Sequence, residues 1–335
     1  MNSLNVFETL DDYYDFDRTD RHKYCYGRVQ NPTVRILEDK IAALEHGCGA
    51  LALASGMAAA STAVFSTIKA GSHVVCLKNA YGPLKDLLTG YCREHMNVET
   101  TFVKGVEVSE FEAVITDKTD LVVLESPSSL VFSLQDIRKV SEIAHAHQAK
   151  VYIDNTYCTP LYQKPLDMGA DIVMHTTSKY IGGHSDVIGG MLVTKDPELF
   201  AKLLHNRELF GGIVGPMEAW LMIRGLRTMA ARLEQHQKTA MEVAKFLEEQ
   251  PMVEKVYYPG LPSHPQYELM KQQQTGNCGL LSFELKGTLE QAVRFAESLK
   301  IFKIGVSWGG FESLVFLPHM RLDDSYHKRH FNAIQ

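Results

Sequence analysis

The sequence predicts an α/β protein with a large, doubly wound, mostly parallel sheet and a smaller C-terminal α/β domain. Before about residue 210, short apolar runs alternate with stretches of helical spacing, a pattern typical of parallel strands covered by helices. After that point the alternation weakens and a long helical stretch begins. The chain of 335 residues is long enough for one large domain and a smaller one.

Six short apolar runs predict the strands of the large sheet. Each is continuously apolar instead of alternating, which is typical of strands that are buried on both faces. The runs lie at residues 50–54, 73–77, 98–103, 121–124, 151–153 and 172–174. The stretches between them, such as residues 134–147, have helical spacing and length.

A capped helix is expected before the first strand, over residues 32–47. Asn31 is a good N-cap, Pro32 suits the first helical position, and Gly47 can end the helix. Apolar residues recur every three or four positions along this stretch, so one face of the helix should be buried.

The C-terminal part has a different pattern. Residues 217–250 predict one long helix, with Pro216 near its start and Pro251 after its end. A strand, a helix and a strand are then expected at residues 280–285, 288–299 and 314–317. The resulting division is an N-terminal arm at residues 1–25, a large ligand-binding domain at 26–215 and a small domain at 216–335.

Composition and charge exclude several classes of protein. Hydrophobic residues make up 45% and charged residues 22%, which excludes a disordered chain. The net charge of −6 argues against a nucleic acid or an anionic membrane as partner, and no apolar run is long enough to span a bilayer. The six cysteines form no CxxC pair, so no metal site is expected. Scattered free thiols and the lack of a signal peptide predict a cytoplasmic protein.

Lys179 is the first candidate for a catalytic residue. Ligands of open parallel sheets bind at the carboxyl ends of the strands, and Lys179 follows the run at residues 172–174. Partial desolvation there lowers the pKa of a lysine and makes its amine a nucleophile that can form a Schiff base with an aldehyde. A solvated surface cation is the alternative for an arbitrary lysine, but the polar and glycine neighbours favour the nucleophile.

Asp154 follows the predicted strand at residues 151–153. A carboxylate at the end of an apolar strand needs a partner, because burying an unpaired charge is unfavourable. A protonated pyridine nitrogen would be such a partner, and the ion pair would make the ring a better electron sink. An N-cap or a structural salt bridge is the alternative.

The turn Ser55-Gly56-Met57 links the first strand to an apolar helix. Backbone N–H groups at a helix N-terminus bind phosphate, and Gly56 allows close approach. Thr176 and Ser178 add hydroxyl donors from another strand end, and Tyr81 could stack on a planar ring or move a proton.

These features together match pyridoxal 5′-phosphate (PLP), which has an aldehyde, a ring nitrogen, a phosphate and a planar ring. A nicotinamide-dependent dehydrogenase is the competing class for such a sheet. It is disfavoured because no GxGxxG follows the first strand.

Several motifs resemble the Cys/Met-metabolism family of PLP enzymes, which includes cystathionine β-lyase, cystathionine γ-lyase, cystathionine γ-synthase and methionine γ-lyase. The motifs are Tyr26-Gly27-Arg28, Asn31-Pro32-Thr33, Ala54-Ser55-Gly56-Met57, Asp154-Asn155-Thr156, the stretch 178–186 around Lys179, and the stretch 307–314. The resemblance covers the chain from about residue 24 to residue 318 and implies the PLP-dependent transferase fold of type I.

The resemblance also implies roles for individual residues. Lys179 would be the Schiff-base lysine and Asp154 the pyridinium partner, with Ser129 in the place of an Asn that contacts the ring hydroxyl. The remaining cofactor contacts would be Gly56, Met57, Thr176 and Ser178 at the phosphate and Tyr81 on the ring.

Other positions point to a second subunit and to the substrate. Tyr26 and Arg28 match a pair that reaches the phosphate of the neighbouring subunit, so the resemblance implies a homo-oligomer, a dimer of dimers with shared active sites. Ser307, Trp308 and Tyr26 would contact the substrate, a small sulfur amino acid.

The motif details favour β-elimination of cystathionine to homocysteine, pyruvate and ammonia. Ser129 and Trp308 both resemble bacterial cystathionine β-lyase, whereas Asn31-Pro32-Thr33 is the general family form. The alternatives are γ-elimination or γ-replacement, as in methionine γ-lyase, cystathionine γ-lyase or γ-synthase.

The family's C-terminal motif Leu-x-Arg-x-x-x-Gly-Leu-Glu, whose Arg binds the substrate carboxylate, does not occur in the sequence. We expect that the final segment of the small domain is missing, with Arg321 or Arg329 as alternative carboxylate ligands. A non-catalytic PLP-binding relative is the second alternative function.

Overall fold

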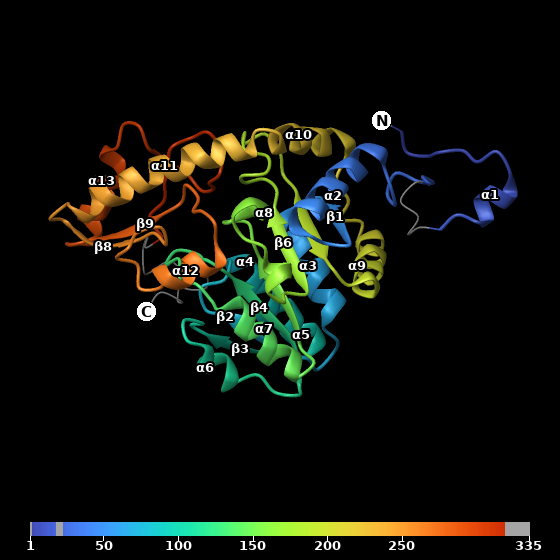
Figure 1. Ribbon diagram of the computed structural model, residues 1–335, viewed down its shortest axis with the longest axis horizontal. Helices are drawn as coiled ribbons and strands as arrows, with labels where there is room; N and C mark the ends of the chain where they lie inside the picture. The colour runs from blue at the N-terminus through green and yellow to red at the C-terminus, as the bar shows by residue number, and fades with distance from the viewer. Residues whose placement is uncertain (1, 18–22, 319–335) are drawn as a thin grey trace.

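The computed structural model describes residues 2–17 and 23–318 and confirms the predicted α/β fold. A large seven-stranded sheet forms the middle of the molecule (Figure 1). Its strands are β1 (Gly49–Leu53), β2 (His73–Leu77), β3 (Glu99–Val103), β4 (Thr119–Glu125), β5 (Lys150–Asp154), β6 (Ile172–Thr176) and β7 (Gly190–Thr194). The six predicted apolar runs therefore all form strands, with shifts of a few residues at their ends.

The strand order is β1-β7-β6-β5-β4-β2-β3, and β2 to β6 run parallel. Strand β7, which was not predicted, lies between β1 and β6 and is antiparallel to both. All five of its residues are buried. Gly190 is needed there, because a Cβ at this position would lie 2.4 Å from the carbonyl oxygen of Ser55.

Helices surround this sheet. They are α2 (Pro32–Glu45), α3 (Gly56–Thr67), α4 (Gly82–Asp86), α5 (Arg93–Met96), α6 (Val108–Glu112), α7 (Ile137–Ala146), α8 (Thr159–Tyr162) and α9 (Pro197–Phe210), with a π-helical turn η1 (Leu87–Cys92) and a 3-10 turn η2 (Pro165–Met168). The first two place the site, because α2 contacts β1 and β7 while α3 contacts β1, β6 and β7.

The predicted cap of α2 is present, since Asn31 Oδ1 accepts hydrogen bonds from the Thr33 and Val34 N–H groups at 3.0 and 3.4 Å. The last helical residue is Glu45; a left-handed His46 follows it, and the Gly47 N–H donates to the Ala42 carbonyl oxygen at 2.8 Å. Gly47 is also a close packing position, because a Cβ there would lie 2.4 Å from Val193 Cγ1 on β7.

The predicted long helix at residues 217–250 is wrong in one respect. It is divided into α10 (Pro216–Leu226) and α11 (Met229–Glu248). The break has a physical cause: the side chains of Thr228 and Arg232 both donate to the carbonyl oxygen of Gly225, which closes the first helix. Gly225 itself packs so closely on the loop after β6 that a Cβ would lie 2.2 Å from the Gly182 carbonyl oxygen.

The remaining elements are smaller. They are β8 (Val253–Tyr257), α12 (Tyr267–Gln273), β9 (Ser282–Leu285), α13 (Leu289–Ser298), β10 (Lys303–Ile304) and β11 (Leu314–Val315). The predicted strand, helix and strand correspond to β9, α13 and β11, whereas β8, α12 and β10 were not predicted. Antiparallel β8 and β9 pack with α11 around a second apolar cluster that includes Leu247, Val256 and Tyr258.

The N-terminal segment projects to the side opposite α13 (Figure 1). It contains the short helix α1 (Leu10–Tyr14) and is joined to the main body by hydrogen bonds between Asn5 N and Cys25 O and between Gly27 N and Ser3 O. Its apolar side chains are exposed, with Val6 88% and Leu10 70% accessible.

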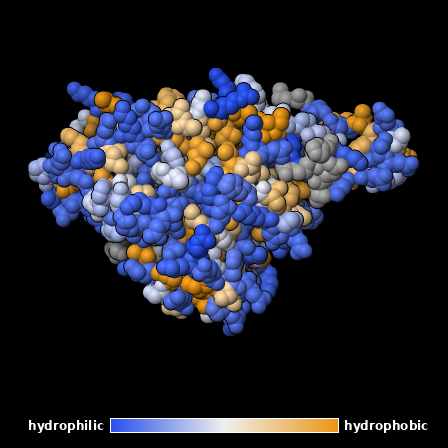
Figure 2. Space-filling view, viewed as in Figure 1, coloured by the Kyte–Doolittle hydropathy of each residue, from blue (hydrophilic) through white to orange (hydrophobic). Residues whose placement is uncertain are grey.

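Figure 2 shows further apolar side chains on the surface near α10. On α10 itself, the side chains of Met217 and Trp220 are about half exposed. Within residues 2–17 and 23–318, no helix is both long enough and apolar enough to cross a membrane.

Candidate active site

Lys179 lies in the loop that follows β6, at the carboxyl end of the large sheet. Its Nζ donates a hydrogen bond to Ser307 Oγ at 2.6 Å and lies 5.2 Å from the centre of the Trp308 ring. Burial lowers the pKa of Lys179, and the negative charge of Asp154 opposes this shift. A larger fraction of the amine is therefore neutral, and able to accept a proton or attack a carbonyl carbon, than for a solvated lysine.

Asp154 is the last residue of β5, next to β6 in the sheet. Its Oδ1 accepts hydrogen bonds from the Thr156 backbone N–H at 2.9 Å and from the Thr156 hydroxyl. Burial raises the pKa of Asp154, while these hydrogen bonds and the charges of His175 and Lys179 lower it. The hydrogen bonds thus hold the carboxylate in place, and the nearby positive charges favour its ionised form. Both are needed in a partner for a cationic ring nitrogen.

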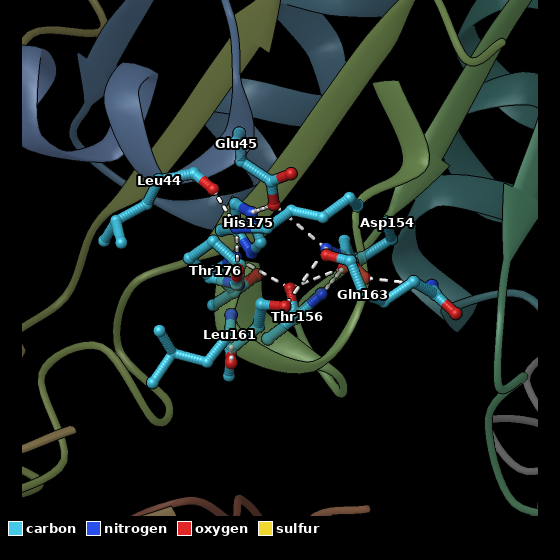
Figure 3. A network of polar contacts seen from close by, with 12 residues as sticks. Leu44, Glu45, Asp154, Thr156, Leu161, Gln163, His175 and Thr176 are labelled. Atoms are coloured by element: carbon cyan, nitrogen blue, oxygen red, sulfur yellow. Dashed lines mark hydrogen bonds and ion pairs between the residues drawn. The ribbon is translucent and has the colours of Figure 1, made fainter. Parts of the chain in front are cut away.

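A buried polar network fixes the ends of β5 and β6 (Figure 3). His175 and Glu45 are both fully buried, and His175 Nε2 lies 2.6 Å from Glu45 Oε1. Asn155 Nδ2 donates to the same Glu45 oxygen at 2.9 Å and to the Gln163 carbonyl oxygen at 3.1 Å. Because Asn155 directly follows Asp154, the network holds the backbone from which the carboxylate projects.

Glu125 is a second carboxylate at the same sheet edge, and no role was predicted for it. It ends β4 and is the register partner of Asp154. Its Oε2 accepts from the Tyr81 backbone N–H at 2.8 Å and its Oε1 from the Ser129 hydroxyl at 2.6 Å. Burial and the nearby charge of Asp154 raise the pKa of Glu125 to about 8. The signal was available, because Glu125 follows an apolar run in the same way that Asp154 does.

Tyr81 precedes α4 and is 48% exposed, so its ring is accessible from the sheet edge. Partial burial of the side chain and the charges of Asp154 and Glu125 raise the pKa of Tyr81. The phenol therefore keeps its proton at neutral pH and can donate it. Ser129, in turn, reaches this cluster through its hydrogen bond to Glu125.

The turn at Gly56 and Met57 begins α3, and Ser55 caps the helix by accepting a hydrogen bond from the Ala58 N–H at 3.0 Å. A Cβ at Gly56 would lie 2.2 Å from Thr176 Oγ1, so the helix start and the end of β6 touch. Ser178, two residues after Thr176, accepts at its Oγ from the Gly189 N–H at 3.0 Å. The structure thus brings Gly56 and Met57, at a helix N-terminus, into contact with Thr176 and places Ser178 in the loop that follows the same strand.

Ser307, Trp308 and Gly309 pack onto the lysine loop. The Trp308 ring lies 5.4 Å from the Tyr180 ring, centre to centre, and Ser307 has a positive φ of 116°. Gly309 has a φ of +84°, and a Cβ there would lie 2.9 Å from the Tyr180 nitrogen and 3.0 Å from the Lys179 carbonyl carbon. The small C-terminal part therefore contributes the hydroxyl that contacts Lys179.

Gly309→Ala should displace this loop. The left-handed conformation costs an alanine about 1–2 kcal/mol, and the added Cβ meets backbone atoms that have no alternative position. We expect kcat/KM to fall at least about tenfold as Ser307 moves away from Lys179. Gly71→Ala is the matched control, because Gly71 has a φ of +80° but nothing within 4 Å of its added Cβ. Equal losses in both variants would show that contact with the lysine loop is unimportant.

Tyr26 and Arg28 precede α2 and make none of the contacts described above at the strand ends. Tyr26 is 46% exposed, and the Arg28 guanidinium lies 5.9 Å from the centre of its ring. Arg28 Nη1 donates to the Glu208 carbonyl oxygen on α9 at 3.0 Å. Arg321 and Arg329, the alternative carboxylate ligands, lie outside the residues that the structure describes.

The chemistry of this donor set fits PLP. A helix N-terminus with two hydroxyls suits the phosphate, and the Asp154 carboxylate suits the ring nitrogen. The partly desolvated Lys179 amine suits the aldehyde, and the accessible Tyr81 ring suits stacking.

Comparisons with known proteins agree with this arrangement. Residues 3–332 match the family described as Cys/Met metabolism PLP-dependent enzyme. The chain is 40% identical over 296 residues to cystathionine γ-lyase of Dictyostelium discoideum, covering 88% of this chain and 76% of that one. It is 42% identical over 297 residues to L-methionine γ-lyase of Porphyromonas gingivalis, covering 88% and 74%. Cystathionine γ-synthase from Xanthomonas oryzae pv. oryzae, solved with cystathionine, superposes with a TM-score of 0.88 at 34% identity, covering 95% and 80%.

These relatives are named for reactions at the γ-carbon, so the comparisons favour the γ alternatives over the predicted β-elimination. Together with the strand-end cluster, they show that the chain belongs to the Cys/Met metabolism family of PLP-dependent enzymes, with pyridoxal 5′-phosphate as cofactor and carbon–sulfur lyase or trans-sulfuration chemistry as its activity.

Proposed function

We propose that the protein breaks the bond between sulfur and the γ-carbon of a sulfur amino acid. The observation that carries this proposal is the position of the Lys179 amine, which is 2.6 Å from Ser307 Oγ and close enough to Asp154 for their charges to interact. γ-Elimination needs one base that serves two neighbouring carbons, and a lysine held at a sheet edge by a single hydroxyl has the freedom to do so. The γ-chemistry named for the relatives supports the same choice.

The cofactor would be held by residues of the large sheet. Lys179 would bind its aldehyde carbon, Asp154 its ring nitrogen, and Tyr81 would lie against the ring. The phosphate would be bound by Gly56, Met57, Thr176 and Ser178. When bound, PLP supplies an electron sink that stabilises negative charge at the substrate Cα. We propose residues 26–215 as the cofactor domain, since these residues all lie within it.

Two side chains, Lys179 and Tyr81, would carry out the proton transfers. The lowered pKa of Lys179 provides a neutral amine that takes the proton from the substrate Cα, and the Ser307 hydroxyl is its hydrogen-bond partner. For γ-elimination the same amine also removes a proton from Cβ. Tyr81 keeps its phenolic proton at neutral pH and can donate it to the departing sulfur.

We also propose that the site is completed by a second copy of the chain. Arg28 and Tyr26 lie together and are both exposed, so a second molecule could contact them. The exposed apolar side chains of Val6 and Leu10 in the N-terminal arm would be covered by the same association. Tyr26 from the second copy would join Ser307 and Trp308 around the substrate.

Product identification tests the reaction. Incubation with cystathionine, and separately with methionine, is expected to yield 2-oxobutanoate, because elimination at the γ-carbon leaves a four-carbon keto acid. The product is identified by derivatisation and mass spectrometry, with heat-inactivated protein as the blank. Pyruvate as the sole keto acid from cystathionine would instead establish β-elimination and overturn the proposal. No keto acid from any thioether amino acid, with PLP bound, would indicate γ-replacement or a non-catalytic relative.

A further inference from the structure

Glu125 and Asp154 place two carboxyl groups at one edge of the sheet. They end the adjacent parallel strands β4 and β5 and are paired in register, so their side chains leave the sheet on the same face. Neighbouring strands lie about 4.8 Å apart. Two carboxylates at such a distance in a partly buried site do not both ionise readily near neutral pH, and one of them retains a proton.

The hydrogen bonds decide which one retains it. Asp154 Oδ1 accepts two hydrogen bonds from Thr156, one from its backbone N–H and one from its hydroxyl. That hydroxyl already accepts from the Thr176 N–H at 2.8 Å, which orients it as a donor to a charged Asp154. Glu125 has the Tyr81 N–H, the Ser129 hydroxyl and the Ser129 backbone N–H as partners. A hydroxyl can accept as well as donate, so a protonated Glu125 can give its proton to Ser129 Oγ while its other oxygen still accepts from the Tyr81 N–H. Glu125 therefore loses no hydrogen bond when it is neutral.

The other groups around Glu125 favour the same state. The titratable groups facing it are Asp154 and the Tyr152 hydroxyl from β5, the Cys76 thiol from β2 and the Tyr81 phenol before α4. Burial raises the pKa of Cys76, Tyr81 and Tyr152, so all three are neutral near pH 7. Asp154 is thus the charged neighbour of Glu125, and it repels a second negative charge.

We propose that Glu125 is a positioning residue that acts as a neutral carboxylic acid: it fixes Tyr81 and Ser129 while leaving the single negative charge of this sheet edge to Asp154. The inference rests on the proposed pairing of Asp154 with the cofactor ring. Its consequence is that Tyr81 stays in place against the ring and that only one carboxylate competes for the ring nitrogen.

Infrared spectroscopy of the holoenzyme tests the protonation state directly. We expect the carbonyl stretching band of a protonated carboxylic acid at neutral pH, which disappears as the pH rises through about 8. The band should be missing in Glu125→Gln and retained in the control Glu94→Gln, which removes an exposed carboxylate on α5. This spectroscopic readout does not depend on the reaction catalysed. The band can be absent although the proposed function is correct, and it can be present although the proposed function is wrong.

Kinetics test the positioning role. A glutamine oxygen can accept from the Tyr81 N–H and its amide can donate to Ser129, so Glu125→Gln should retain at least about tenfold more kcat than Glu125→Ala. The two variants should differ less in KM, because the loss lies in Tyr81 placement. A band that survives in Glu125→Gln would overturn the inference. Equal kcat in the glutamine and alanine variants would overturn it as well.

Discussion

Replacing Lys179 with alanine is expected to lower kcat by about 100- to 10,000-fold, the range associated with loss of a positioned general base. The variant removes the amine that lies 2.6 Å from Ser307 Oγ and no other side chain in the described part of the site carries an amine. It should also bind PLP reversibly, so that the cofactor is lost on dialysis. Initial rates of keto-acid release and the absorbance of the dialysed protein measure the two effects.

Lys202→Ala is the control for this variant, because Lys202 is exposed on α9 and makes none of the contacts described at the site. It should keep the activity and the bound cofactor. A Lys179→Ala protein that retains within about tenfold of the normal kcat would show that another group acts as the base, and the assignment of Lys179 would fail.

Asp154→Asn is expected to have the second largest effect, a fall of about 100-fold or more in kcat. Asparagine retains an oxygen that accepts from Thr156, so the shape of the site is preserved while its negative charge is lost. Without that charge, a bound ring nitrogen is no longer held protonated and electron withdrawal from the substrate Cα weakens.

The stability of this variant separates charge from structure. Burial raises the pKa of Asp154 in the folded protein above its unfolded value, so ionisation of this group opposes folding once the pH exceeds the unfolded pKa. In the cofactor-free protein at neutral pH, the Tm of Asp154→Asn should therefore equal or exceed that of the unmodified protein. Asp117→Asn, at an exposed carboxylate, is the control for activity. A lower Tm together with the lost activity would point to misfolding and remove support for the electrostatic role.

The large sheet could be predicted because its strands are buried on both faces, so they appear as continuous apolar runs. The antiparallel strand β7 was missed because it begins at Gly190 and a glycine-rich loop precedes it, so no turn signal separates its apolar residues from that loop. The break between α10 and α11 depends on side-chain contacts of Thr228 and Arg232 with Gly225, which helical periodicity does not report.

Parts of the site could be predicted because the apolar runs also show where the strands end. Lys179 and Asp154 follow apolar strands, and the rule that ligands bind at strand ends was enough to select them. Glu125 obeys the same rule, yet only the register of β4 and β5 shows that it lies beside Asp154. The contact between Lys179 and Ser307 joins residues 128 positions apart and requires the folded loop at Gly309.

The choice between β- and γ-elimination shows the limit of short motifs. Ser129 and Trp308 favoured the β reaction when taken alone, but Ser129 donates to Glu125 and Trp308 packs on Tyr180. Neither contact selects the carbon from which sulfur leaves. Identity over most of the chain is the broader comparison, and it favours γ-chemistry.

Mapping the covalent attachment of the cofactor tests the central assignment most directly. The holoenzyme is treated with borohydride, digested and analysed by peptide mass spectrometry, with untreated protein in parallel. The added mass of the reduced cofactor is expected on the peptide that contains Lys179. A reduced cofactor found on another lysine, with residue 179 unmodified, would contradict the entire arrangement of the site.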